Sequence, residues 1–379
     1  MDVAIRGPEA GFDVVVVGAG VIGLAAAAAL SRAGRTVLIL EREEGIARGI
    51  TSRNSQVVHA GIYYPKGSLK ADLCVVGRRR LEAWCATKRV GMRRLGKLIV
   101  ATRAGEEAIL EDLEGRGRAN GVTGLRLIDR AEISRFEPEV AALGALWSPE
   151  TGIVDAHALS LSLLAAAESA GAILAVARIV TALHPRSFGW QVETQGGDGR
   201  LESIDAGLVV DAAGLEADRI ARLAGLDVDS LGWCQRPCKG DYFTLGPGAR
   251  IALEHLIYPV PRQAGLGIHA TLDLAGRLRF GPDTEYVDEV RFDVDPTKAE
   301  GFRRAVARYL PRVGDRALVP DQAGIRPKLA GPGEGFRDFV IEETSDRGAP
   351  GFVACLGIES PGLTAALAIG DRIASFGSA

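Results

Sequence analysis

The sequence has few cysteines, and their pattern argues against both a disulfide framework and a metal site. The five cysteines are an odd number, and none of them forms a CxxC pair. Cys234 and Cys238 are close enough in sequence to share a metal ion, but no histidine or further cysteine lies near them to complete a tetrahedral set. We therefore predict free thiols in a reducing compartment and no bound metal.

An excess of charge is also lacking. The chain has 45 lysines and arginines against 48 acidic residues, a formal net charge of -3. Nothing in this balance recruits nucleic acid or an anionic membrane surface. With 379 residues, 47% of them hydrophobic and 25% charged, the chain is an ordinary globular protein, long enough for two domains.

One uncharged run, Val14 to Leu30, resembles a short membrane-spanning helix on hydropathy alone. Three glycines lie in its first half, it starts with valines, and it continues into the charged "SRAGR". These features indicate a buried strand that turns into a helix. The preceding "MDVAIRGPEA" has two acidic residues and one arginine, unlike a signal peptide. We therefore predict a cytoplasmic protein without a transmembrane segment.

The same run contains the strongest local motif of the chain. "FDVVVVGAG" is typical of a strand buried on both faces, "VIGLAAAAALSRAG" of a helix that ends at Gly34, and "TVLILE" of a second strand. Together they predict a βαβ unit whose first turn, Gly18-Ala19-Gly20-Val21-Ile22-Gly23, lies at the carboxyl edge of a parallel sheet.

This turn predicts a site for a dinucleotide. Its glycines allow a tight turn, a close approach of backbone to pyrophosphate, and close packing of helix on strand. Glu41 ends the second strand, where a carboxylate can accept both ribose hydroxyls. The charge of Glu41 argues against a cofactor with a 2′-phosphate on this ribose. Arg42, the next residue, could bind such a phosphate and leaves this question open. The alternative is a glycine-rich turn without a ligand, and the motif by itself does not separate FAD from NAD.

The end of the chain bears on that choice. In "GIESPGLTAALAIGDRIA", we predict Ser360 as the N-cap of a helix and Pro361 as its first residue. The helix N-terminus is then free to face an anion, such as a reduced flavin with negative charge near N1 and the C2 carbonyl. The alternative for this segment is a well-capped surface helix.

The remaining sequence indicates a second lobe. Residues 92–149 mix short strands with charged helices, and residues 232–295 alternate as in an antiparallel sheet. No long linker or repeat separates the two lobes. The predicted fold class is α/β, with a Rossmann-like domain of the glutathione-reductase type interleaved with an α+β domain built on an antiparallel sheet.

Together these motifs resemble the FAD-dependent oxidoreductases of the D-amino-acid oxidase superfamily over nearly the whole chain. Within it, several segments are similar to the L-2-hydroxyglutarate dehydrogenase/oxidase family, although its better-known members usually have histidine in place of Arg53, glycine in place of Gln56, and somewhat longer chains. The segments are "VHAGIYYPKGSLKADLCVVG", "GKLIV", "TGIVD", "AAGLEADRIA", "KGDYF", "IYPVP", "GIRPKL" and "GIESPGLTAALAIG".

The resemblance implies a discontinuous FAD-binding domain of residues 11–90, 150–225 and 321–379. Residues 91–149 and 226–320 would form the substrate-binding domain. It also implies the set of residues that hold FAD along its length, from the ADP half to the isoalloxazine edge. These are Gly18, Gly20, Gly23, Glu41, Arg42, Ser52, Arg53, Asn54, Ser55, Ile179, Ala213, Gly214, Gly357, Ser360, Gly362, Leu363 and Thr364.

Oxidation of a 2-hydroxy acid needs a cation for the carboxylate and a base for the hydroxyl proton, beside the flavin. We predict Arg326 as the cation, since a guanidinium gives two parallel bonds to a carboxylate. The alternative is a surface arginine bounded by Pro327. His59 and His269 are the candidate bases, because an imidazole accepts protons near neutral pH. A structural role is the alternative for each, and the resemblance favours His59 as the base, with His269 a substrate contact.

Three further residues are candidate substrate contacts. Tyr64 and Tyr258 can donate hydroxyl groups and form walls of the site, with core packing as the alternative. Lys239, in "KGDYF", could pair with a second carboxylate, with a solvated turn lysine as the alternative.

The predicted function is hydride transfer from the alpha carbon of a small carboxylic acid to FAD, with L-2-hydroxyglutarate to 2-oxoglutarate as the favoured reaction. An amino acid or secondary amine is the alternative substrate, and a non-catalytic flavin-binding protein is a third reading. Oxygen, a quinone and an electron-transfer flavoprotein all stay open as acceptors, and a quinone would allow contact with the membrane periphery. We expect non-covalent FAD, with links to His59 or Cys355 as alternatives.

Overall fold

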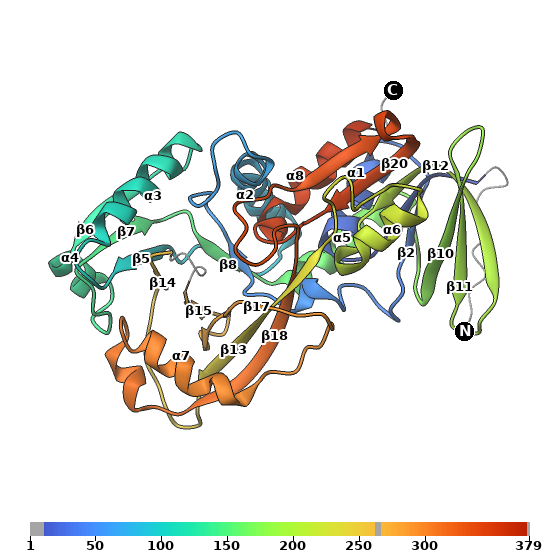
Figure 1. Ribbon diagram of the computed structural model, residues 1–379. Coiled ribbons are helices and arrows are strands. Elements are labelled where there is room, and N and C mark those ends of the chain that lie inside the picture. The colour runs from blue at the N-terminus through green and yellow to red at the C-terminus, as the bar shows by residue number, and fades with distance from the viewer. Residues whose placement is uncertain (1–10, 262–266, 377–379) are drawn as a thin grey trace.

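The computed structural model describes residues 11–261 and 267–376, and its strands form three sheets (Figure 1). The first sheet carries the glycine-rich turn. Its strand order is β10 (Arg178–Pro185), β11 (Trp190–Gly196), β12 (Leu201–Asp211), β1 (Phe12–Val17), β2 (Val37–Leu40) and β9 (Ile173–Ala175); β20 (Ala349–Leu356) also pairs with β12, and β19 (Val340–Thr344) with β20.

The predicted βαβ unit is present at the centre of this sheet. Strand β1 runs parallel to both β2 and β12, and the valines of β1 are buried on both faces. Val14 and Val16 pack on the side of the helices α1 (Val21–Arg32), α2 (Leu69–Lys88), α5 (Ala156–Ser169) and α8 (Gly362–Phe376). Val15 and Val17 face α6 (Ala217–Leu223). Helices on both faces explain why this strand has no polar alternation.

Helix α8 packs between α1 and α2 at glycine positions. A Cβ atom at Gly77 of α2 would lie 2.6 Å from the Thr364 carbonyl oxygen, and one at Gly370 of α8 would lie 2.5 Å from the Ala25 carbonyl oxygen. Both separations are too short for any side chain. The C-terminal helix is therefore fixed to the first βαβ unit and to α2, as the red and blue helices show at the centre of Figure 1.

The second sheet forms the other lobe, over a core of its own. Its order is β17 (Glu285–Tyr286), β13 (Arg236–Leu245), β16 (Leu278–Phe280), β15 (Ala270–Leu272), β14 (Leu256–Pro259), β5 (Lys97–Ala101), β7 (Gly144–Ser148) and β6 (Arg126–Asp129), with β18 (Leu318–Lys328) on β13; α3 (Glu107–Ala119), α4 (Arg130–Phe136) and α7 (Ala299–Val306) belong to this lobe. Its pairings are antiparallel except that of β14 with β5.

Short elements complete the chain. A small sheet of β3 (Val57–Val58), β8 (Gly152–Val154) and β4 (Met92–Arg93) lies beside α2. Single 3₁₀ turns are η1 (Ile50–Ser52), η2 (Gly214–Glu216), η3 (Pro296–Lys298), η4 (Pro311–Asp315) and η5 (Ser345–Arg347). Across residues 11–261 and 267–376, no helix is both long and apolar enough to span a membrane.

The predicted fold class is confirmed, and one predicted domain boundary falls inside a strand. Residue 321 lies inside β18, which pairs with β13 of the second sheet from Leu318 to Lys328. The predicted boundary at residue 321 therefore divides this strand between the two lobes. The wider division into two domains stays a prediction.

Candidate active site

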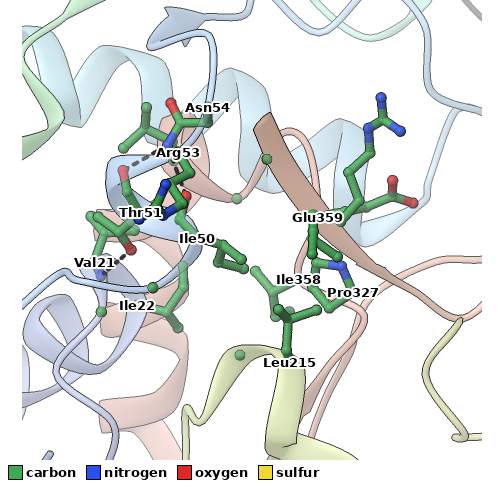
Figure 2. A pocket seen from close by; sticks show the side chains of 18 of the residues that line it. Val21, Ile22, Ile50, Thr51, Arg53, Asn54, Leu215, Pro327, Ile358 and Glu359 are labelled. Atoms are coloured by element: carbon green, nitrogen blue, oxygen red, sulfur yellow. Dashed lines mark hydrogen bonds between the residues drawn. The ribbon is translucent and has the colours of Figure 1, made fainter. Parts of the chain in front are cut away.

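A cavity of about 760 Å³ is lined by both lobes. Residues of the glycine-rich turn and of the 50–55 segment form one wall, and Leu215, Pro327 and Ile358 lie across from them (Figure 2). A volume of this size suits a cofactor or a drug-sized ligand. Most of the predicted site residues line this cavity, namely Gly18, Gly20, Glu41, Arg42, Arg53, Asn54, Ser55, His59, Tyr64, Ile179, Ala213, Gly214, Tyr258, His269, Arg326, Ser360, Gly362, Leu363 and Thr364.

The three motif glycines have three different surroundings. Gly18 has a φ of +104°, and a Cβ there would lie 2.6 Å from the Ala212 carbonyl oxygen, so the turn itself requires glycine. A Cβ at Gly23 would lie 1.9 Å from the Gly18 carbonyl oxygen, so helix and strand are in backbone contact there. Gly20 borders the cavity, and its Cβ would meet only the Thr51 hydroxyl, at 3.2 Å. The open position of Gly20 fits a pyrophosphate at the helix N-terminus.

Glu41 is held rigidly at the cavity wall. Its Oε2 accepts a hydrogen bond from the Ala19 amide at 2.7 Å, and its Oε1 accepts one from the Glu43 amide at 2.9 Å. The side chain is largely buried, yet it borders the cavity. A carboxylate oxygen has a second lone pair, so Glu41 can still accept the hydroxyls of a ribose. These residues therefore fit the ADP half of FAD.

The segment from Ile50 to Gln56 is fixed by its own side chains. Thr51 Oγ1 accepts a hydrogen bond from the Val21 amide at 3.1 Å, at the start of α1 (Figure 2). Asn54 Nδ2 donates to the Thr51 carbonyl at 2.7 Å, and Asn54 Oδ1 accepts from the Gln56 amide at 2.7 Å. The segment thus keeps its shape along the cavity without a ligand.

The two residues that depart from the resembled family, Gln56 and Arg53, lie in different local settings. Gln56 has a φ of +59°, a conformation that glycine adopts at no cost and other residues adopt at a cost of about 1 kcal/mol. The guanidinium of Arg53 lies over the ring of Phe292, with 4.4 Å between Cζ and the ring centroid. A Cβ at Gly324 would lie 2.1 Å from the Arg53 carbonyl oxygen, so β18 passes directly against this segment.

The N-terminus of α8 differs from the prediction. The helix begins at Gly362, one residue after the predicted start at Pro361. The Pro361 carbonyl is the first to accept a helical hydrogen bond, from the Ala365 amide at 2.9 Å. Ser360 is not seen to cap the helix. Its hydroxyl lies 3.1 Å from His59 Nε2 and 3.3 Å from the Tyr64 hydroxyl. The serine that the sequence assigned to a helix cap therefore joins the candidate base to a tyrosine.

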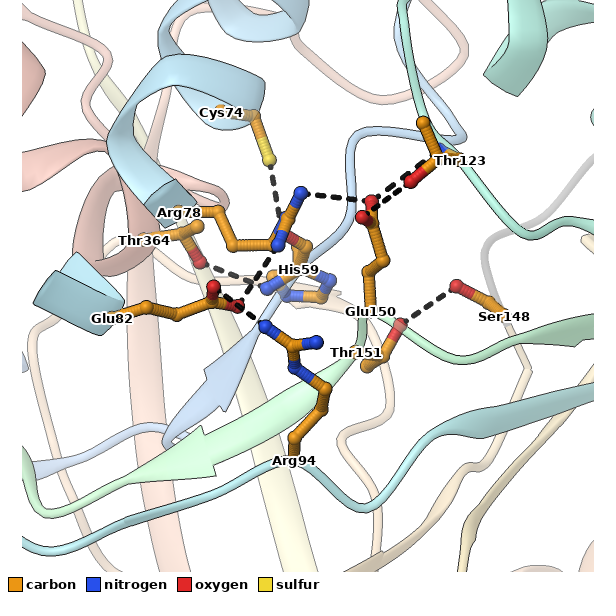
Figure 3. Close-up of polar contacts among 10 residues, drawn as sticks. All are labelled: His59, Cys74, Arg78, Glu82, Arg94, Thr123, Ser148, Glu150, Thr151 and Thr364. Atoms are coloured by element: carbon orange, nitrogen blue, oxygen red, sulfur yellow. Dashed lines mark hydrogen bonds and ion pairs between the residues drawn. The ribbon is translucent and has the colours of Figure 1, made fainter. Parts of the chain in front are cut away.

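His59 is held from both its backbone and its ring. Its amide donates to Thr364 Oγ1 at 3.0 Å, and its carbonyl accepts from Cys74 Sγ at 3.4 Å (Figure 3). Ring atom Nδ1 is buried and has no hydrogen-bond partner among the residues that the structure describes. Burial, and secondarily the charge of Lys97, lowers the pKa of His59 to about 3. The imidazole is therefore neutral at physiological pH and can accept a proton.

A buried ion-pair network supports α2 beside His59. The Arg78 side chain is 3% exposed, and its two terminal nitrogens bond Glu82 at 2.9 Å and Glu150 at 2.8 Å. Glu82 also binds Arg94 at 2.7 Å, as Figure 3 shows. The network ties α2 to the segments around β4 and β8. We read it as structural, because its charges are paired and none of these residues borders the cavity.

Arg326 faces the cavity from β18. Its Nη1 lies 3.1 Å from Cys238 Sγ, and its Nη2 donates to the Asp283 carbonyl at 2.5 Å. No carboxylate pairs with it in residues 11–261 and 267–376. An arginine that is fixed in place, borders a cavity and lacks an anionic partner is suited to bind one.

An aromatic wall lies in the same cavity. The rings of Tyr258 and His269 are stacked, with centroids 3.5 Å apart and planes at 10°. Both rings are buried, and Tyr63 and Tyr64 also border the cavity. The structure thus brings together the predicted candidates His59, His269, Tyr64, Tyr258 and Arg326.

Four predicted site residues are not brought to the cavity. Lys239 does not reach the cavity because of its place on β13. Cys238 is paired directly with Arg326, so Lys239, the residue after Cys238, points to the opposite face of the sheet. There its Nζ lies 3.6 Å from the Asp241 carboxylate. Ser52 is exposed and donates to the Gly49 carbonyl. Gly23 packs on Gly18, and Gly357 lies under Leu329, with its amide bonded to Gln235.

The sequence analysis missed four charged or polar residues near the site. Thr51 at the start of α1 had no distinguishing signal. Lys70, Lys328 and Glu359 all border the cavity. Glu359 lies 2.9 Å from Lys70 and 3.5 Å from Lys328, and the pKa of Glu359 is lowered, mainly by Lys70, against the effect of burial. A signal existed for Lys70, Lys328 and Glu359, since all three stand inside quoted family motifs.

Comparison with known proteins identifies the family. A family model described as "DAO: FAD dependent oxidoreductase" matches residues 13–376. The chain belongs to this family. The L-2-hydroxyglutarate dehydrogenase, mitochondrial, of Arabidopsis thaliana is 39% identical over 403 residues, covering 96% of this chain and 83% of the relative. The protein of the same name from Pongo abelii is 34% identical, covering 96% and 86%. L-2-hydroxyglutarate dehydrogenase of Escherichia coli K12 is 29% identical, covering 96% and 92%.

Solved structures agree with this assignment to the DAO family. The dithionite-reduced L-alpha-glycerophosphate oxidase of Mycoplasma pneumoniae, described with FAD bound, has a TM-score of 0.85 and 27% identity, covering 96% of this chain and 94% of that one. A glycine oxidase of Geobacillus kaustophilus shares the fold, with a TM-score of 0.79 and 23% identity, covering 95% and 92%. The protein is an FAD-dependent oxidoreductase, so the predicted enzyme class and cofactor are confirmed.

We expect Glu41→Ala to weaken FAD binding about 10- to 100-fold, because it removes hydrogen bonds between a charged carboxylate and the ribose. The measurement is the dissociation constant of FAD for the apoprotein, from the quenching of flavin fluorescence. Glu44→Ala is the matched control, since the Glu44 side chain is 85% exposed and is not among the residues that line the cavity. Equal affinities for the two variants would contradict the assignment of Glu41.

Proposed function

We propose that the protein oxidises L-2-hydroxyglutarate to 2-oxoglutarate with bound FAD. The observation that carries this proposal is Arg326, a fixed cation at the cavity without a carboxylate partner in the described residues. The relatives named L-2-hydroxyglutarate dehydrogenase, which are 29–39% identical over 96% of the chain, support this substrate.

In this proposal the protein does three things to the substrate. Arg326 binds the carboxylate next to the reacting carbon with two charge-assisted hydrogen bonds. The neutral His59 accepts the hydroxyl proton at Nε2, the ring atom directed toward Ser360 and the cavity. The stacked Tyr258 and His269 rings limit the space in which the substrate can lie. When bound, FAD supplies the acceptor for the hydride.

The hydroxyls of Ser360 and Tyr64 extend from His59 as a line of groups that can each donate and accept a proton. A pKa of about 3 makes His59 by itself a weak base. A bound dianion would raise this pKa, because a nearby negative charge favours the imidazolium. The base would therefore gain strength when the substrate is present.

We assign the second carboxylate of the substrate to Lys328 in place of Lys239. Lys328 follows Arg326 by two residues on β18, about 6.7 Å along the strand, a distance that a five-carbon diacid and a flexible lysine can bridge. Among the described residues, Lys70 and Lys328 share one carboxylate, that of Glu359, and Arg326 is ion-paired with none. This local excess of positive charge suits a dianion better than a monocarboxylate.

No observation favours the amine substrate or the non-catalytic reading over this one. The glycine oxidase neighbour is 23% identical and indicates the fold alone. A cytoplasmic location stays our proposal; the names of the Arabidopsis and Pongo relatives include "mitochondrial", and that of the Escherichia coli relative does not.

The relatives' name, dehydrogenase, supports an electron acceptor other than oxygen, such as a quinone or an electron-transfer flavoprotein. We therefore expect turnover with L-2-hydroxyglutarate to reduce a soluble quinone analogue faster than it consumes oxygen. Parallel measurement with an oxygen electrode and by quinone absorbance checks this. Oxygen consumption as fast as quinone reduction would argue for an oxidase.

Arg326→Met should slow flavin reduction by L-2-hydroxyglutarate at least about 100-fold at subsaturating substrate, because a bidentate charged contact is lost. Arg326→Lys should recover part of the loss, since it keeps the charge without the fork. Anaerobic rapid mixing, followed at the flavin absorbance, gives the rates. Arg304→Met, on the exposed face of α7, is the control. Wild-type rates in Arg326→Met would refute the clamp.

Lys328→Met should reduce kcat/KM for L-2-hydroxyglutarate about tenfold more than kcat/KM for L-2-hydroxybutyrate, which lacks the second carboxylate. The comparison of two substrates on one variant cancels any general damage to the site. Lys88→Met, at the far end of α2, is the matched control. A loss of equal size for both substrates would remove Lys328 from the recognition of the second carboxylate.

A further inference from the structure

Lys97 is a buried lysine that neither the sequence analysis nor the mechanism above uses. It is the first residue of β5, and only 1% of its surface is exposed. In the part of the chain that the structure describes, no carboxylate pairs with it. An ammonium group buried without an anion costs several kcal/mol, so its presence calls for a compensating role.

The surroundings of Lys97 place it directly behind the aromatic wall of the cavity. Its Nζ lies 4.6 Å from the ring centroid of Tyr63 and 4.7 Å from that of Tyr258. Both distances are within the range of cation–π attraction. Both rings also line the cavity, and Tyr258 is stacked on His269. The cation thus contacts two of the rings that line the cavity.

Two further titratable groups face this cation. His59, which precedes Tyr63 in the same segment, has its pKa lowered by burial and then by Lys97. Cys74 of α2 has its pKa raised to about 12 by burial, against the opposing effects of Lys97 and Arg78, and is a neutral thiol. The phenols of Tyr63 and Tyr258 are neutral as well, since burial raises their pKa above the ordinary value. No group in this set neutralises the lysine.

We propose that Lys97 is a positioning residue for the oxidation: it holds Tyr63 and Tyr258 in place by cation–π contacts and supplies a fixed positive charge that stabilises the anionic substrate and its developing alkoxide. This inference rests on the proposed function and deepens it. It gives the buried ammonium group of Lys97 a role that offsets the cost of its burial.

The proposal predicts a particular dependence on pH. Burial lowers the pKa of Lys97 to about 7, with Cys74 opposing the shift. Lys97 is therefore charged below pH 7 in the free enzyme and loses its charge as the pH rises through about 7. The benefit of the lysine to kcat/KM should be present at pH 6 and lost by pH 9, since kcat/KM follows the ionisation of the free enzyme.

The experiment compares kcat/KM for L-2-hydroxyglutarate in the holoenzyme, Lys97→Met, Lys97→Gln and Lys97→Arg from pH 6 to pH 9. We expect Lys97→Met and Lys97→Gln to lose about tenfold at pH 6 and to approach the wild-type value at pH 9. Lys97→Arg should retain activity at pH 6 and keep it at pH 9, because a guanidinium stays charged. FAD content and thermal midpoints show which variants fold, and Lys88→Met is the control.

A loss of the same size at pH 6 and pH 9 in both neutral variants would overturn the proposal and leave Lys97 with a packing role. A second readout separates this result from a failure of the proposed function. Glutarate, a dicarboxylate without the reacting hydroxyl, is titrated into each holoenzyme and followed by the perturbation of the flavin spectrum. Even if L-2-hydroxyglutarate is not oxidised, this titration tests the role of Lys97. The proposal is supported if wild type binds glutarate more tightly than Lys97→Met at pH 6 and equally tightly at pH 9. It is refuted if wild type and Lys97→Met bind glutarate equally at pH 6.

Discussion

The close packing of α8 against α1 and α2 is the constraint on which the rest of the site depends. Gly77 and Gly370 allow backbone contact with neighbouring helices, and no larger residue fits at either position. This contact fixes Thr364, which accepts the amide hydrogen of His59, and Ser360, which contacts its ring. The candidate base is thus held by α8, although His59 and Thr364 are 305 residues apart in the sequence. Activity and stability are therefore linked through helix packing.

The second theme is an uneven distribution of charge. The whole chain is nearly neutral, but the cavity concentrates cations. Arg326, Lys70 and Lys328 border it with one carboxylate among them, and Lys97 lies behind its aromatic wall. Buried cations are costly in an empty site, and a bound dianion offsets that cost. Such a charge distribution favours a dicarboxylate over a cationic amine.

Some of the site could be predicted from the sequence, because local backbone rules determine it. The glycine spacing and Glu41 follow from what a βαβ turn requires, and the structure gives each glycine a distinct reason. Side-chain direction on a strand could not be predicted. The sequence analysis named Lys239 and did not consider Lys328, and the pairing of β13 with β18 is what shows which face each lysine takes. Lys97 was missed because a lysine at the first position of a strand is usually exposed. Ser360 fitted a helix cap locally, but its tertiary contacts with His59 and Tyr64 decide its role.

The most direct test of the account is anaerobic mixing of the holoenzyme with L-2-hydroxyglutarate, followed at the flavin absorbance. The account predicts rapid bleaching of the flavin by this diacid and much slower bleaching by glycine, D-alanine and sarcosine. A flavin that stays oxidised with L-2-hydroxyglutarate, or that is bleached faster by one of the amines, would contradict it.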